Sequence, residues 1–255
     1  MKTDPALENS AVSLHGTRFF MPREGKEPVE MNLYLRNDDT THPLVINLHG
    51  GAFIAGDVDA MDEQSDRISK AWNVNVATVD YKLLSGSYDI PYGTNEVIDT
   101  VKYFREHAQE YQIDPAAIFL LGYSAGAYYA VASTLALKQE GFDVAGQIIC
   151  YGFLKEANYT YLAMDEADRT SIAPALFILA DNDPISESSL TYQKSLEANG
   201  IPTQVKKYKG ALHTFMEGTL NMESLASFIR ISEQELLARQ AENLVGEWIH
   251  TRLEA

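Results

Sequence analysis

Short strand-like segments alternate with helical segments along most of the chain. The segments with the length and β-branched or apolar content of strands are 31–35, 43–48, 74–79, 118–121, 147–151, 175–180 and 204–208. The segments with helical spacing of apolar residues are 94–108, 125–137, 188–199 and 233–250. Alternation of this kind is typical of a parallel sheet with helices on both faces. The sequence therefore predicts an α/β fold with a mostly parallel central sheet.

A single domain is the expected organisation. The chain has 255 residues, of which 45% are hydrophobic, so it can form a substantial core. One α/β domain of about 200–250 residues is ordinary. Neither an internal repeat nor a linker divides the sequence. We therefore predict one domain over 1–255, in which 1–30 form a polar N-terminal extension.

The charge of the chain argues against anionic partners. Twenty basic and 36 acidic residues give a formal net charge of −16. Binding of nucleic acid requires clustered Lys and Arg, so neither nucleic acid nor an anionic membrane is an expected partner. No run of 18 apolar residues and no signal-like N-terminus is visible. The single cysteine, which we expect to be a core thiol, cannot form an intramolecular disulfide, and this suits a reducing compartment. The expected location is therefore the cytoplasm.

The segment Gly122-Tyr123-Ser124-Ala125-Gly126 fits the G-x-S-x-G nucleophile elbow. This motif requires a sharp turn from a strand into a helix, and small residues on both sides let the backbones pass closely. The predicted strand before Gly122 and the Ala-rich helix after Ser124 supply that context. A glycine-rich turn without function is the alternative. The context favours Ser124 as a catalytic nucleophile.

A second glycine-rich segment, His49-Gly50-Gly51-Ala52, also follows a predicted strand. Acyl transfer passes through a tetrahedral intermediate whose negative oxygen must be stabilised by fixed N–H groups. A plain β-turn is the alternative interpretation, and the elbow 75 residues further on weakens it. We therefore predict an oxyanion hole formed by the backbone amides of Gly51, Ala52 and Ala125.

A serine nucleophile needs a base, and the base needs an orienting acid. His213 follows the strand over 204–208, where an α/β fold presents such a base, and we predict that it is the base. His49 belongs to the glycine-rich segment 49–52, called the oxyanion loop below, and is expected to hold that loop in place. The acid should lie between the serine and the histidine in sequence. Asp181 and Asp183 both follow the strand over 175–180. We favour Asp183, because Asp181 could instead form an Asx-type turn.

Taken together, these motifs resemble the α/β-hydrolases, and within them the esterases related to hormone-sensitive lipase and to bacterial acetylesterases. The resemblance covers Leu33 to the C-terminus. It implies ester hydrolysis by a Ser–Asp–His triad without a cofactor, with Asp183 as the acid. Tyr123 and Ala52 depart from the Asp and Gly of the hormone-sensitive-lipase pattern, and Tyr123 favours relatives like acetyl-xylan and feruloyl esterases. The motifs that carry the resemblance are His49-Gly50-Gly51, Asp80-Tyr81-Lys82-Leu83, Ile113-Asp114-Pro115, Gly122 to Gly126, Asp183-Pro184-Ile185 and His213-Thr214-Phe215.

Two segments are expected near the substrate. The segment 154–172 is predicted as a small lid insertion, with a polar surface loop as the alternative. The segment 218–232 is predicted as an amphipathic helix that packs mainly on the core. Neither is long enough for a deep lipase lid. No spacing of Cys, His or acidic residues typical of a metal site is present, so no metal or other cofactor is expected.

The sequence thus predicts a serine carboxylesterase that acts on short- to medium-chain esters, with sugar acetates among the candidates. The same triad could instead cleave an amide, a formamide or a peptide. A non-catalytic binding module is the third alternative, and the intact set of Ser124, Asp183 and His213 argues against it. Neither the residues that bind the substrate nor the oligomeric state can be assigned from the sequence.

Overall fold

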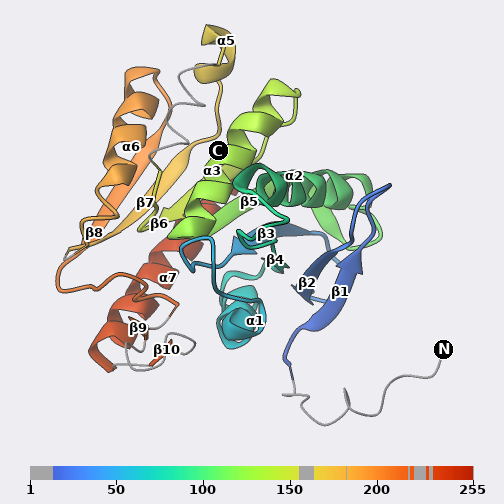
Figure 1. Ribbon diagram of the computed structural model, residues 1–255, viewed down its shortest axis with the longest axis horizontal. Helices are drawn as coiled ribbons and strands as arrows, with labels where there is room; N and C mark the ends of the chain where they lie inside the picture. The colour runs from blue at the N-terminus through green and yellow to red at the C-terminus, as the bar shows by residue number, and fades with distance from the viewer. Residues whose placement is uncertain are drawn as a thin grey trace.

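In the computed structural model, the described residues form one central sheet flanked by helices (Figure 1). The structure describes 14–154, 164–181, 183–217, 219–220, 228–229 and 232–254. Within these ranges the sheet has eight strands in the order β1-β2-β4-β3-β5-β6-β7-β8. The bounds are β1 Thr17–Met21, β2 Val29–Tyr34, β3 His42–Leu48, β4 Asn75–Asp80, β5 Ile113–Tyr123, β6 Gly146–Cys150, β7 Ala175–Ala180 and β8 Thr203–Tyr208.

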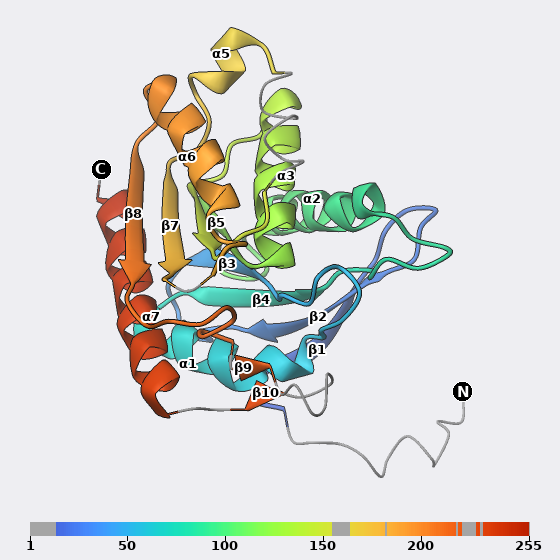
Figure 2. The ribbon, with the colours of Figure 1, turned by 60° about the vertical axis from the view of Figure 1, so that its left-hand side comes forward.

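The sheet is parallel except at one edge. Strand β2 pairs antiparallel with β1 and with β4, whereas β4, β3, β5, β6, β7 and β8 run parallel to one another. This arrangement brings the carboxyl ends of the parallel strands to one edge of the sheet, which points downward in Figure 2 for β7 and β8. Loops that follow these strands are therefore neighbours. The α/β fold predicted from the alternating segments is confirmed.

Helices cover both faces of the sheet. Residues of α2, α3 and α6 belong to one core cluster, and residues of α1 and α7 belong to the other. In β5 the side chains alternate between them, since Ile118 and Leu120 lie in the first cluster and Phe119 and Leu121 in the second. The bounds are α1 Asp62–Trp72, preceded by the 3-10 turn η1 Asp59–Met61, α2 Ile90–Glu106, α3 Ala125–Gln139, α5 Glu166–Arg169, α6 Ser188–Ala198 and α7 Ser232–Leu253.

Most predicted elements are confirmed to within five residues at each end, and the exceptions have identifiable causes. Helix α2 begins four residues earlier than expected, because Asp89 caps it and accepts a hydrogen bond from the Tyr92 amide at 2.9 Å. Strand β1 and helix α1 were not predicted. Helix α1 lacks the helical spacing of apolar residues because its inner face carries polar residues such as Ser65. The Ser65 hydroxyl forms hydrogen bonds with Asn47 and Thr78 in the interior.

The amphipathic helix predicted over 218–232 is wrong for the residues described there. Thr219–Leu220 (β9) and Phe228–Ile229 (β10) form a short antiparallel pair, and α7 begins at Ser232. Thr, Phe and Ile have a high β propensity. Strand pairing is therefore favoured here, although the apolar residues of the segment have helical spacing. The remaining residues of this segment, and 155–163 of the predicted lid, lie outside the described residues. The lone Cys150 is buried, as expected for a core thiol.

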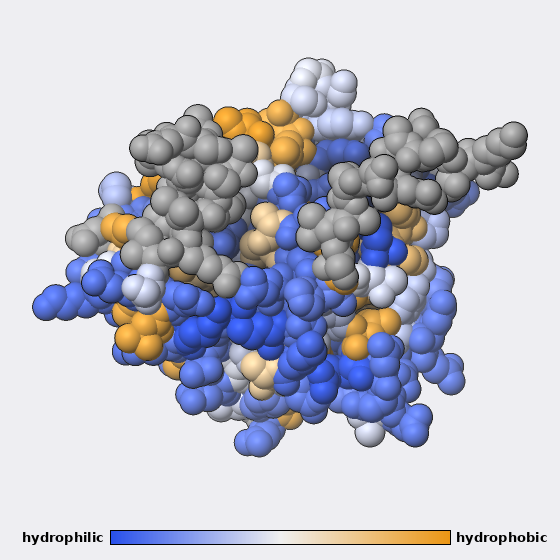
Figure 3. Space-filling view, turned by 90° about the horizontal axis from the view of Figure 1, so that it is seen from below, coloured by the Kyte–Doolittle hydropathy of each residue, from blue (hydrophilic) through white to orange (hydrophobic). Residues whose placement is uncertain are grey.

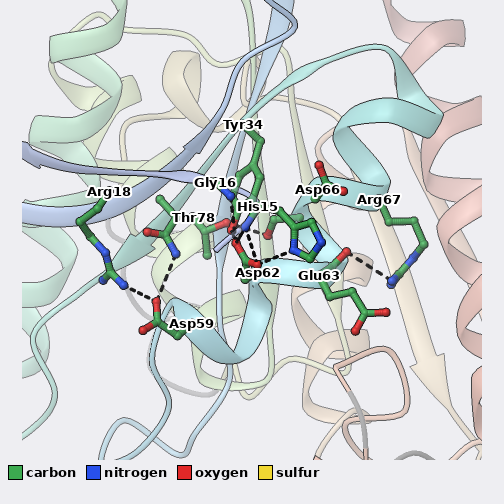
Figure 4. Close-up of polar contacts among 12 residues, drawn as sticks. His15, Gly16, Arg18, Tyr34, Asp59, Asp62, Glu63, Asp66, Arg67 and Thr78 are labelled. Carbon is green, nitrogen blue, oxygen red and sulfur yellow. Dashed lines mark hydrogen bonds and ion pairs between the residues drawn. The ribbon is translucent and has the colours of Figure 1, made fainter. Parts of the chain in front are cut away.

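The carboxylate of Asp62 ties the antiparallel edge of the sheet to helix α1 (Figure 4). It accepts hydrogen bonds from the backbone amides of His15 and Gly16, from His15 Nδ1 at 2.7 Å and from the Tyr34 hydroxyl at 2.8 Å. The hydrogen bond to Asp62 raises the pKa of His15. Because protonated His15 binds the carboxylate more strongly, this contact weakens as the pH rises through the pKa of His15. One acidic side chain thus fixes the start of the described chain.

We expect Asp62→Ala to lower the free energy of unfolding by about 1–3 kcal/mol, because it leaves the buried Tyr34 hydroxyl and the two amides without their acceptor. Asp66→Ala is the matched control in the same helix. Asp66 pairs with the exposed Lys70, and such a pair contributes only about 0.3–0.5 kcal/mol. Urea unfolding measures both variants. Equal losses in the two variants would contradict the role of Asp62.

Candidate active site

Ser124 occupies a sharp turn between β5 and α3. Its backbone has φ 50° and ψ −110°, a conformation that residues other than glycine rarely adopt. The turn works only because Gly122 and Gly126 lack side chains. A Cβ atom on Gly126 would run into the carbonyl oxygens of Leu48 and His49, and one on Gly122 would run into the backbone of Gly126. The glycines let α3 begin against the end of β3.

The structure brings Ser124, His213 and Asp183 together from the ends of three different strands. Ser124 Oγ lies 2.9 Å from His213 Nε2, and His213 Nδ1 lies 2.7 Å from Asp183 Oδ2. The Asp183 carboxyl is buried, and its Oδ1 accepts a hydrogen bond from the Ile185 amide at 2.9 Å. Because a carboxylate only accepts, Nδ1 carries the proton and Nε2 is left to accept from the serine hydroxyl.

Asp181, the alternative acid, lies elsewhere. Its carboxylate pairs with Lys207 at 3.4 Å and is partly exposed, and its backbone amide donates to the Tyr208 carbonyl at 3.2 Å. The contact with His213 is therefore made by Asp183, the residue that the sequence favours. The catalytic roles of Ser124, His213 and Asp183 stay predictions, for which this geometry is the physical basis.

The loop after β3 turns sharply through three consecutive residues with positive φ. Gly51 has φ 128°, and the next two residues, Ala52 and Phe53, also have positive φ, at 52° and 68°. Ile54 and Ala55 donate their amides to the Gly51 carbonyl at 3.0 and 2.9 Å, which closes a tight turn. Within the described ranges, no acceptor binds the amides of Gly51, Ala52 or Ala125. These are the three donors predicted from the sequence.

His49 is held inside the protein. Its ring is buried and stacks on Tyr81 with ring centroids 4.3 Å apart, and its Nδ1 lies 2.6 Å from the Gly50 carbonyl oxygen. The Tyr81 hydroxyl donates to the His49 carbonyl at 2.6 Å. Burial lowers the pKa of His49, which keeps the ring neutral. This environment fits a residue that supports the loop, as the sequence predicts.

Two residues near the site could not be recognised from the sequence. Tyr151, at the end of β6, packs its ring against that of His213 with centroids 5.2 Å apart. Glu217, four residues after His213, bonds the Gly50 amide and the Tyr151 hydroxyl. The only available signal was an acidic residue directly after the apolar pair Phe215 and Met216. Across the described residues, no three His, Cys, Asp or Glu side chains gather as metal ligands would.

Comparison with known proteins gives a consistent result. The model of a family described by the α/β hydrolase fold matches 45–169 and 154–217, which together span more than half of the chain. A hyperthermophilic esterase from the archaeon Pyrobaculum calidifontis is 21% identical with a TM-score of 0.78, over 95% of this chain and 87% of that chain. The thermophilic carboxylesterase EstE1, cloned from a metagenomic library, is 20% identical with a TM-score of 0.77, over 97% and 93%.

One of two fungal esterases from Rhizomucor miehei is 19% identical with a TM-score of 0.77, and the match covers 94% of this chain and 84% of that chain. The TM-scores show a shared fold, and at identities this low the likeness shows the fold alone. The family match agrees with the parallel sheet, the turn at Ser124 and the order of the motifs. As its resemblance to the esterases related to hormone-sensitive lipase predicts, the chain belongs to the α/β-hydrolase family.

Proposed function

We propose that the protein is a serine carboxylesterase that hydrolyses short- to medium-chain carboxylic esters. The observation that carries the proposal is the hydrogen-bonded series Ser124–His213–Asp183 at distances of 2.9 and 2.7 Å. Amides without an acceptor among the described residues lie on the neighbouring loop and at the start of α3. The esterases of similar fold add support from their printed descriptions.

The geometry leads to a two-step reaction. Ser124 Oγ attacks the ester carbonyl carbon while His213 Nε2 accepts its proton, and Asp183 holds the ring and stabilises the imidazolium. The amides of Gly51, Ala52 and Ala125 donate to the oxyanion. His213 then returns the proton to the leaving alcohol. Water attacks the acyl-enzyme by the reverse proton transfers, which restores the serine.

Apolar side chains around this edge of the sheet favour an ester with an apolar part. They follow the ends of different strands and are partly exposed: Ile54, Phe153, Ile185 and Leu212. The Phe153 amide lies 3.4 Å from the Ser124 carbonyl oxygen, and Leu212 precedes His213. Figure 3 views this side, and hydrophobic clusters interrupt a mainly hydrophilic surface there. The net charge of −16 works against anionic esters by repulsion.

No helix among the described residues is long and apolar enough to cross a bilayer. The cytoplasmic location, the single domain over 1–255 and the choice between sugar acetates and aliphatic esters stay predictions.

Hydrolysis of p-nitrophenyl esters from acetate to octanoate tests the proposal. We expect turnover on the shorter esters and a loss of at least about 10³-fold in Ser124→Ala, because the nucleophile is removed. A fluorophosphonate should label the wild-type protein at Ser124 and leave the variant unlabelled. A matching set of p-nitroanilides and formamides serves as the comparison. Turnover of amides alone would replace the esterase by an amidase, and no turnover and no labelling would indicate a binding module.

The acid is tested by a pair of neighbouring substitutions. Asp183→Asn should lower kcat by about 10²–10⁴-fold, because an amide can donate to Nδ1 and stabilise the wrong tautomer of His213. Asp181→Asn removes a partly exposed ion pair with Lys207 and should change kcat by less than about 2-fold. Steady-state kinetics on the best ester measures both. A larger loss of kcat in Asp181→Asn than in Asp183→Asn would assign the role of the acid to Asp181.

A further inference from the structure

The loop that carries His213 ends in an acidic side chain that reaches the oxyanion loop. Glu217 Oε1 accepts a hydrogen bond from the Gly50 amide at 2.6 Å, and Glu217 Oε2 accepts one from the Tyr151 hydroxyl at 3.2 Å. The two amino acids of the first contact are 167 positions apart in sequence. A tight turn between Thr214 and Glu217 and a bond from Gln64 to the Met216 carbonyl fix the position of this residue.

The contacts of Glu217 complete a clamp on one peptide unit. The His49–Gly50 peptide is bonded on both sides, because its carbonyl accepts from the Tyr81 hydroxyl at 2.6 Å and its N–H donates to Glu217. The next peptide, Gly50–Gly51, is held on its carbonyl side by His49 Nδ1 at 2.6 Å. Since N–H and C=O point in opposite directions in a trans peptide, fixing that carbonyl fixes the direction of the Gly51 amide.

The Glu217 carboxyl group occupies the space beside Gly50. A Cβ atom on Gly50 would lie 2.9 and 3.0 Å from the two carboxylate oxygens of Glu217. Gly50 is absent from the residues with positive φ, so its backbone conformation does not itself require glycine. Gly51 differs, because its φ of 128° does require it. The two adjacent glycines therefore differ: Gly51 is required by its backbone conformation, whereas a side chain at Gly50 would have to displace the Glu217 carboxyl group.

Burial makes this carboxyl group costly to keep. It raises the pKa of Glu217 to about 7, although the hydrogen bonds from Gly50 and Tyr151 act in the opposite direction. Among the described residues no ion pair compensates the charge of Glu217. An apolar side chain would remove that desolvation cost. Despite this cost, the carboxyl group lies where it bonds the Gly50 amide and the Tyr151 hydroxyl. The ring of Tyr151 in turn packs against that of His213.

We propose that Glu217 is a positioning residue that sets the oxyanion hole, by holding the Gly50 amide so that the amides of Gly51 and Ala52 face the tetrahedral intermediate. The inference rests on the proposed function, since it assigns a role within that site. Glu217 itself does not touch the ester. It acts through the peptide that it clamps, so its loss should lower the rate of the chemical step more than the binding of the ester.

Two substitutions at Glu217 and one at Gly50 test the proposal. Glu217→Ala should lower kcat by about 10- to 100-fold, less than the 10²–10³ typical of a lost oxyanion donor, with KM within about 3-fold. Glu217→Gln keeps an acceptor oxygen for Gly50 and should stay within about 3-fold of the wild type. Glu110→Ala removes an exposed carboxylate and is the control, with unchanged kinetics. An effect of Glu217→Ala that falls on KM, or a Gln variant as slow as the Ala variant, would overturn the proposal.

A double-mutant cycle separates positioning from general destabilisation. Gly50→Ala should displace the carboxylate and cost about as much as Glu217→Ala, whereas Gly50→Ala added to Glu217→Ala should cost less than about 3-fold further. Losses that multiply would contradict the shared mechanism. If a urea titration shows that Glu217→Ala is unfolded, the comparison of Gly50→Ala with Glu217→Gln tests the proposal instead. A kcat of Gly50→Ala equal to that of the wild type would then overturn the proposal.

The proposed function and this inference can fail separately. The rate of fluorophosphonate labelling of Ser124 also depends on the oxyanion hole, and it requires no knowledge of the substrate. If the wild type is labelled but hydrolyses no ester, the esterase proposal fails and the labelling rates still decide the role of Glu217. Labelling of Glu217→Ala at least about 10-fold slower than Glu217→Gln supports the inference. Equal labelling rates in these two variants overturn it.

Discussion

Helix α3 begins in backbone contact with the end of β3, and the site depends on that contact. Gly126 packs against the carbonyl oxygens of Leu48 and His49 at a distance that leaves no space for a side chain. The contact places the turn at Ser124 beside the loop that starts at His49. The nucleophile and the proposed oxyanion donors are therefore neighbours because two backbones touch. The acid and the base reach the same edge independently, from β7 and β8, because parallel strands end together.

Much of the fold could be predicted from the sequence, because buried parallel strands are short apolar runs. The segment Ala175–Ala180 is predicted with its observed bounds. Helix α1 could not be predicted, since polar side chains such as Ser65 and Gln64 face the interior and find their partners only in the folded chain. Strand β1 contains the short apolar run Phe19-Phe20-Met21 but lies in an otherwise polar N-terminal stretch, at the edge of the sheet. The pair β9 and β10 replaces a predicted helix, because pairing between strands overrides local spacing.

Part of the candidate site could likewise be predicted from the sequence, and part of it could not. Ser124, His213 and the glycine-rich loop could be predicted, since each follows a predicted strand and the chemistry limits the residue types. Asp183 was separable from Asp181 only by its place in the turn, and the structure adds the 2.7 Å contact with His213. Glu217 and Tyr151 gave no recognisable pattern. Their partners are far away in sequence, and a carboxyl that serves a backbone amide leaves no motif beyond a neighbouring glycine, here Gly50.

The anchoring of His15 and Gly16 to Asp62 has a practical consequence for handling the protein. Two residues after Asp62, Gln64 bonds the Met216 carbonyl, so the described chain starts close to the loop that carries His213. The end of α7 lies at the opposite edge of the sheet, because Trp248 packs against Gly146 at the start of β6. A chemical label placed near the end of α7 is therefore held away from the loop that carries His213, whereas a label placed near Gly16 is not.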